Sequence, residues 1–124
     1  MTHLEKAQEL RARTDVHFNC CQAVLVTFAE DLGLTEQQAY DLGANFGSGM
    51  RCGSVCGTLT GALMVLGMRG CDGDRSAAFL RQFREKHGEI NCAALLKASH
   101  DAGIPRKEHC DGLVFEVVEA LEQN

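Results

Sequence analysis

Hydrophobic residues recur along this chain at the spacing of an α-helix and rarely alternate as they would in a β-strand. Leu4, Ala7 and Leu10 predict a polar first helix. The clearest stripe follows at positions i, i+3, i+4, i+7 and i+11, formed by Cys21, Val24, Leu25, Phe28 and Leu32. We expect this second helix to end at Gly33, because glycine commonly terminates helices.

The next two elements differ in how their apolar residues are distributed. Thr35 and Gln38 have the spacing of a capping box and predict the start of a helix that continues to Phe46. A glycine-rich loop around residues 47–49 follows. From Val55 to Met68 the sequence is apolar on nearly every side, which predicts the buried central helix of a bundle.

Three further helices complete the expected fold. Phe79, Leu80 and Phe83 mark the inner face of one, a short helix begins at about Asn91, and the last begins at about Glu108. Short connections favour antiparallel packing of neighbouring helices. The sequence therefore predicts an all-α fold, a compact helical bundle of about five to seven helices, in a single domain spanning residues 1–124.

Composition and charge exclude several classes of function. The net charge of −5, the scattered basic residues and the absence of tryptophan argue against nucleic-acid binding. The longest apolar run, Ala62 to Met68, is too short for membrane insertion. The charged N-terminal sequence lacks the pattern of a signal peptide, so we expect a cytoplasmic protein. A homodimer remains open, as does the identity of a redox partner protein.

The seven cysteines are the unusual feature of the composition. Their odd number and the absence of an export signal argue against a complete set of structural disulfides. Cys20, Cys56, Cys92 and Cys110 each fall near the predicted start of a different helix, where unpaired N–H groups and the helix dipole favour thiolate. Thiolate binds metals and attacks disulfides, so these residues predict a redox or metal site if the helix starts converge.

Core packing is the alternative for any single cysteine, because free cysteine is often a buried apolar residue. We expect Cys21, inside its stripe, to be such a core residue and Cys71, in a polar turn, to be an exposed thiol. Cys52 would stack one turn below Cys56 and join the site if the central helix begins early.

Glycines accompany the cysteines of the central segment. Gly53, Gly57 and Gly61 recur every fourth residue, which would leave one helix face without side chains. A cofactor could lie against the bare backbone there, with N–H groups of Gly53 to Gly57 bonding to sulfur, or a neighbouring helix could pack closely. Both interpretations stand at this stage.

The segments FNCCQAV, FGSGM, VCGTLTGALMVLG, GEINCAALL and HCDGLVFEVVEALE carry a family resemblance. From Phe18 onward the chain resembles the redox-active C_GCAxxG_C_C family, named for four cysteines, one inside a CGAxxG box. The family cysteines fall on Cys20, Cys56, Cys92 and Cys110, and Thr58 stands where alanine is usual. The family is also similar to the C-terminal part of split-Soret cytochromes, a region associated with an iron–sulfur cluster. The haem motif C-x-x-C-H is absent, so haem is not expected.

Three functions are compatible with these residues. The first is an electron carrier or oxidoreductase component that binds an iron–sulfur cluster through Cys20, Cys56, Cys92 and Cys110, with Gly53 and Gly57 beside it. The second is a metal-free thiol–disulfide protein using Cys52 and Cys56, although C-x-x-C spacing is absent. The third is a structural or sensing zinc site on the same four cysteines. We expect the isolated protein to contain either bound metal or a disulfide among these cysteines and Cys52.

Overall fold

The computed structural model describes residues 1–124 and is entirely helical, which confirms the predicted fold class. The only strand-like contact is an isolated bridge between Val55 and Asn91. In chain order the helical elements are α1 (His3–Ala12), α2 (Cys20–Phe28), α3 (Glu36–Gly43), the single turn η1 (Gly49–Gly53), α4 (Gly57–Met68), α5 (Gly73–His87), α6 (Cys92–Asp101) and α7 (Arg106–Glu122).

Side-chain caps set the start of the first three helices. The hydroxyls of Thr2 and Thr35 and the amide of Asn19 each accept a hydrogen bond from the backbone three residues later. A glutamate or glutamine at that position returns a bond to the cap residue, completing a capping box in all three cases. The box predicted at Thr35 and Gln38 is confirmed, and the one at Asn19 fixes the position of Cys20 as the first residue of α2.

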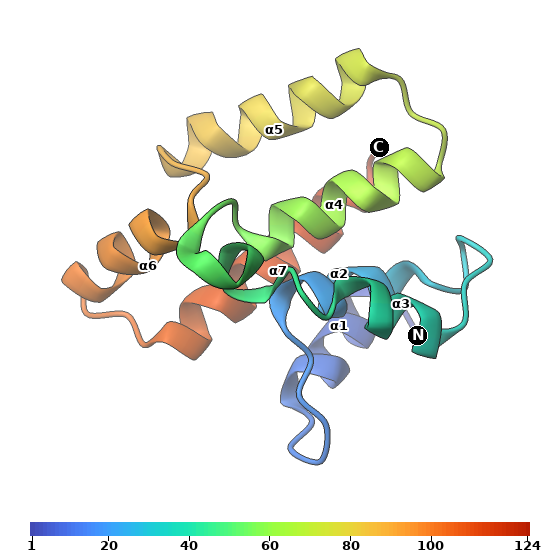
Figure 1. The fold of residues 1–124 in the computed structure, drawn as a ribbon, viewed down its shortest axis with the longest axis horizontal. Helices are drawn as coiled ribbons and strands as arrows, with labels where there is room; N and C mark the ends of the chain where they lie inside the picture. The colour runs from blue at the N-terminus through green and yellow to red at the C-terminus, as the bar shows by residue number, and fades with distance from the viewer.

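Helix α2 is the centre of the fold. It contacts α1, α3, α4 and α7, and every one of its residues is buried. Figure 1 shows α5 lying outside α4, and α6 at one end of the molecule beside the start of α7. The buried apolar residues form one continuous core. Because α2 is enclosed on several sides, its first turn lies at the junction of helices that are distant in sequence.

Four predicted helix boundaries differ from the structure. Helix α3 ends at Gly43 rather than at Phe46, because the N–H groups of Ala44 and Phe46 bond to carbonyls only three residues earlier and close a turn. Helix α2 ends at Phe28, and turns continue to Gly33, which has a φ of +74°. Helix α4 begins at Gly57 rather than at Val55, because the backbone N–H of Cys56 bonds to the carbonyl of Ile90 at 2.8 Å. Helix α7 begins at Arg106, so Cys110 lies in its second turn rather than its first.

The predicted glycine face is only partly present. Gly53 lies outside α4 with a φ of +74°, so it does not continue a helical stripe toward Gly57. A Cβ at Gly57 would lie 2.5 Å from the carbonyl oxygen of Phe46 and 2.8 Å from Cys20 Sγ, and one at Gly61 would lie 3.1 Å from Val24 Cβ. These two glycines therefore permit close packing of α4 against α2, which was one of the two interpretations of the pattern.

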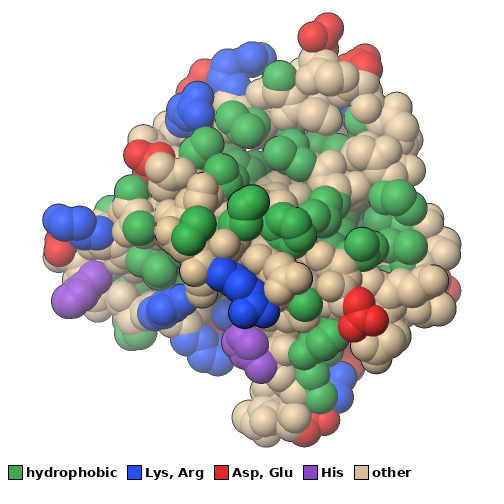
Figure 2. Space-filling view, viewed as in Figure 1, with side chains coloured by type: hydrophobic (Ala, Val, Ile, Leu, Met, Phe, Trp, Pro, Cys, Tyr) green, Lys and Arg blue, Asp and Glu red, His purple; other side chains and the backbone are tan.

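The surface combines charged groups with several exposed apolar side chains. In the view of Figure 2, hydrophobic side chains gather across the centre of the face, and most charged groups lie nearer its edge. Leu42, Met50 and Met68 are among the large apolar residues that are more than half exposed. None of the helices is both long enough and apolar enough to cross a membrane.

Candidate functional site

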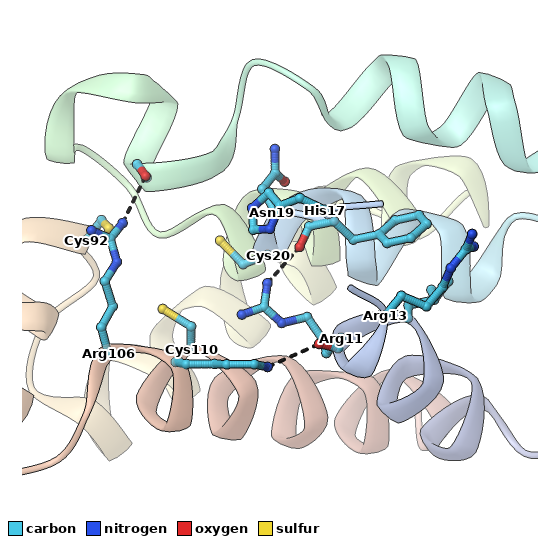
Figure 3. Close-up of a pocket in the computed structure, with 12 residues that line it drawn as sticks. Arg11, Arg13, His17, Asn19, Cys20, Cys92, Arg106 and Cys110 are labelled. Atoms are coloured by element: carbon cyan, nitrogen blue, oxygen red, sulfur yellow. Dashed lines mark hydrogen bonds between the residues drawn. The ribbon is translucent and has the colours of Figure 1, made fainter. Parts of the chain in front are cut away.

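Three of the four singled-out cysteines line the same pocket. Cys20, Cys92 and Cys110 share the wall of a cavity of about 430 Å³, although they come from α2, α6 and α7. Figure 3 shows their side chains approaching one space from these three helices. Cys20 and Cys92 are each the first residue of their helix. The structure thus brings together thiols that are separated by 72 and 90 residues from Cys20 in the sequence.

Cys56 neighbours Cys20 but is not part of the pocket wall. It is the N-cap residue of α4 and is 5% exposed. Its thiol lies beside the thiol of Cys20 and shifts the pKa of that thiol, at the close contact between α2 and α4 that Gly57 permits. The fourth cysteine is therefore joined to the pocket through Cys20.

A tight left-handed turn forms another part of the site. Ser48, Gly49, Met50 and Arg51 all have φ between 54° and 63°, and only one of the four is glycine. Left-handed backbone costs non-glycine residues roughly 1–2 kcal/mol each, so tertiary contacts must hold this turn. A Cβ on Gly49 would lie 2.7 Å from Cys92 Cβ and 2.4 Å from the carbonyl oxygen of Ser54. The turn is pressed against the cysteine that begins α6.

Basic side chains surround the thiols. Arg11, Arg13, Arg106 and Lys107 line the pocket. The side chain of Arg11 is only 9% exposed; it donates to Asp111 Oδ1 at 2.6 Å and to the carbonyl of Phe18 at 2.7 Å.

Arg106 differs from these other cations because it forms no ion pair with a carboxylate. It donates instead to the Ser48 hydroxyl at 3.1 Å, as Figure 3 shows. This arginine places an uncompensated positive charge beside Cys92 and Cys110, in a chain whose net charge is −5.

The contact between Cys20 and Cys56 shifts the pKa values of the two thiols in opposite directions. The neighbouring Cys56 thiol lowers the pKa of Cys20 to about 6, against the opposing effect of burial; Thr58, Arg11 and the backbone of Ser48 also lower it. The same contact, together with burial, raises the pKa of Cys56. Cys20 is therefore the thiolate of the pair at neutral pH, and Cys56 keeps its proton.

The other two pocket thiols are less acidic. Burial raises the pKa of Cys92 and of Cys110, and the negative charge of Cys20 raises both further. Arg106 opposes this effect at both positions, and Arg11 opposes it at Cys110. Without a bound cation the pocket thus carries one thiolate and two thiols, because neighbouring negative charges disfavour one another.

Several predicted residues lie outside this group. Cys52 is exposed on η1, where its thiol donates to the carbonyl of Gly49 at 3.6 Å, so it does not stack on α4 below Cys56. Gly53 lies on the same turn, away from the backbone of α4. Cys71 is half-buried against the core rather than fully exposed. Cys21 is fully buried, and burial raises its pKa to about 12, as suits a core residue.

The N–H groups expected to bond to sulfur are partly engaged elsewhere. The Ser54 N–H bonds to the carbonyl of Gly49 at 2.8 Å, and the Cys56 N–H is taken by Ile90. Sequence reasoning also missed Arg11, Arg106 and Ser48, which approach the thiols only through tertiary contacts. The sequence offered one indication that the backbone at Ser48 is closely packed, namely the glycine on each side of it. In the structure neither Gly47 nor Gly49 has room for a Cβ.

The site holds no compact set of ligands for a single metal ion. No three histidine, cysteine, aspartate or glutamate side chains stand close enough together to hold one ion, and all seven cysteines are free thiols. Three thiols on one pocket wall, with a fourth thiol beside Cys20, match in number the four cysteine ligands that iron–sulfur clusters use. The surrounding arginines would offset the negative charge of such ligands.

The acidity of Cys20 leads to a testable pH dependence. In metal-free, reduced protein we expect its alkylation by iodoacetamide to rise with pH to half its maximum at about pH 6. The rate should fall below that pH, because the thiolate is the nucleophile. Peptide mass spectrometry would follow the modification of Cys20. Replacing Cys56 by alanine should move the midpoint upward, toward the ordinary value of about 8.5, and an unchanged midpoint would contradict the assigned cause.

Comparison with known proteins identifies a family for this chain. No curated protein and no solved structure matches the chain. A family model described as "Putative redox-active protein (C_GCAxxG_C_C)" matches residues 18–124. This range includes all the cysteines, both glycines at the contact of α2 with α4, and the left-handed turn, and it leaves out the whole of α1. The chain therefore belongs to the C_GCAxxG_C_C family of redox-active proteins.

Proposed function

We propose that this protein transfers electrons through an iron–sulfur cluster held by Cys20, Cys56, Cys92 and Cys110. The observation that carries the proposal is the shared pocket of Cys20, Cys92 and Cys110, together with the position of Cys56 beside Cys20. Simple core packing would not require thiols from three helices to face one cavity. Bound there, a cluster would supply a redox centre whose potential depends on its charge, its hydrogen bonds and its exposure to solvent.

The electrostatics of the pocket support this assignment. Four thiolate ligands bring four negative charges, and the metal-free site favours only one thiolate. A cationic cofactor core would remove the repulsion that raises the pKa of Cys92 and Cys110. Arg106 and Arg11 would stabilise the remaining negative charge of the loaded site. Electrons would be exchanged with a redox partner protein.

Anaerobic purification tests the proposal. We expect the protein, isolated without oxygen or reconstituted with ferrous iron and sulfide, to contain iron and acid-labile sulfide and to absorb visible light that bleaches with dithionite. A colourless protein that binds neither iron nor sulfide after reconstitution would overturn the proposal. Zinc without sulfide would favour the structural or sensing zinc site, which requires rearrangement because no three ligands now surround one ion.

A metal-free thiol–disulfide function is the second candidate, and the contact of Cys20 with Cys56 favours it. A thiolate beside a buried thiol is the arrangement of a redox dithiol. Cys20 would attack a substrate disulfide, release one of its thiolates and form a mixed disulfide. Cys56, losing its proton, would then attack the Cys20 sulfur, form the Cys20–Cys56 disulfide and release the second substrate thiolate. The reactive pair would be Cys20 with Cys56, in place of the predicted Cys52 with Cys56.

A further inference from the structure

The hydroxyl of Thr58 is buried without a hydrogen-bond partner. Thr58 is 0% exposed, and its Oγ1 is the one buried side-chain nitrogen or oxygen atom in the chain that forms no hydrogen bond. Buried polar atoms are nearly always paired, because an unpaired group loses its bonds to water at a cost of roughly 1–3 kcal/mol. The burial of the Thr58 hydroxyl without a hydrogen-bond partner therefore requires a physical reason.

Other threonines show what a helical hydroxyl ordinarily does. Thr27 donates to the carbonyl of Ala23 at 2.7 Å, and Thr60 donates to the carbonyl of Cys56 at 3.3 Å, each four residues earlier. The corresponding residue for Thr58 is Ser54, which precedes α4 and whose carbonyl accepts the N–H of Cys92 at 2.6 Å. Thr58, the second residue of α4, has no helical carbonyl to bond.

The sulfurs of Cys20 and Cys56 are two potential acceptors near this hydroxyl. Thr58 lies two residues after Cys56, on the turn of α4 that packs closely against Cys20. The hydroxyl lies near both sulfurs, yet it forms no hydrogen bond to the uncharged thiols. A neutral thiol is a weak acceptor, whereas a thiolate or a metal-bound sulfur accepts strongly. The hydroxyl thus faces a group whose capacity to accept a bond increases with its charge.

We infer that the Thr58 hydroxyl donates to the charged sulfur of the Cys20–Cys56 pair and so raises the reduction potential of the site. The inference rests on the redox function proposed above. In either chemistry the reduced state carries more negative charge on sulfur: a disulfide gains two electrons and one proton to give a thiolate and a thiol, and a cluster gains one electron. A donor aimed at sulfur stabilises that state, so its removal lowers the potential.

Thr58→Val tests the role, because valine keeps the shape of threonine and removes the donor. We expect about a tenfold shift of the redox equilibrium toward the oxidised state, which corresponds to about 30 mV for a two-electron couple or about 59 mV for a one-electron couple. Mediator titration would measure the couple in cluster-loaded protein, and equilibration with reduced and oxidised glutathione would measure it in metal-free protein. Thr58→Ser, which keeps the hydroxyl, should retain a potential near that of the parent protein.

Stability provides a second measurement that does not depend on a cofactor. If the hydroxyl supports the Cys20 thiolate, reduced Thr58→Val protein should unfold at lower urea concentration than the parent at pH 8. The inference would be overturned if Thr58→Val protein were at least as stable as the parent and had the same reduction potential. That result would show that the hydroxyl forms no hydrogen bond to the charged sulfur. Failure to find iron or a Cys20–Cys56 disulfide in the parent would instead refute the proposed function, and the urea comparison would still decide the role of Thr58.

Discussion

Replacing Cys20 by serine is expected to abolish cluster binding, leaving anaerobically reconstituted protein with little iron or sulfide. Cys20 is the thiolate of the site, lines the pocket and lies beside Cys56, so its loss would remove one proposed ligand and separate Cys56 from the pocket. Serine is close in size to cysteine but is a poor ligand for iron. Iron and sulfide analysis with visible absorption would measure the loss, and circular dichroism would verify that the helices remain.

Cys71→Ser is the matched control for this variant. Cys71 is half-buried against the core and lies outside the pocket, so its replacement should leave the iron content unchanged. Equal loss of iron in the Cys71 and Cys20 variants would contradict the ligand assignment, because it would attribute the effect to a general change in the protein.

The remaining pocket cysteines separate the two redox mechanisms. If a cluster is bound, Cys92→Ser and Cys110→Ser should each reduce its iron content strongly, because both side chains line the same cavity as Cys20. If the function is a metal-free dithiol, neither change should prevent the Cys20–Cys56 disulfide from forming with oxidised glutathione. Mass spectrometry of non-reduced peptides would identify that bond.

Gly57→Ala is expected to destabilise the fold by about 1–3 kcal/mol, the usual cost of adding a methyl group to a tightly packed interior. The new Cβ would lie 2.5 Å from the carbonyl oxygen of Phe46 and 2.8 Å from Cys20 Sγ, so α4 would have to move away from α2. The same movement would separate Cys56 from Cys20. Urea unfolding of the reduced, metal-free protein would give the free energy of unfolding.

Gly67→Ala is the control within the same helix and should have the opposite effect. Nothing lies within 4 Å of a Cβ at Gly67, and the residue is exposed near the end of α4. Alanine is favoured over glycine within a helix by roughly 0.5–1 kcal/mol, so this variant should be slightly more stable than the parent. Destabilisation of similar size in both variants would show that the packing of Gly57 is not the cause.

The amino-acid sequence alone determined the helical class and most helix starts. The apolar spacing of α2 and the capping box at Thr35 act over three or four residues, and such local interactions persist in any fold that contains the helix. Cys20 and Cys92 were correctly placed at helix starts for the same reason. The family pattern selected these two cysteines together with Cys56 and Cys110, and the match over residues 18–124 confirmed the family.

Only the tertiary structure decided how these cysteines meet. Gly53 and Cys52 had helical spacing relative to Gly57 and Cys56, yet the contacts of Ser54 with Cys92 and of Cys56 with Ile90 hold their segment outside α4. The left-handed turn at Ser48, the contact of Cys20 with Cys56 and the approach of Arg106 to the pocket likewise join segments far apart in the chain. Periodicity reports which face of a helix is buried, but it contains no information on which other segment covers that face, and the chemistry of this site depends on that pairing.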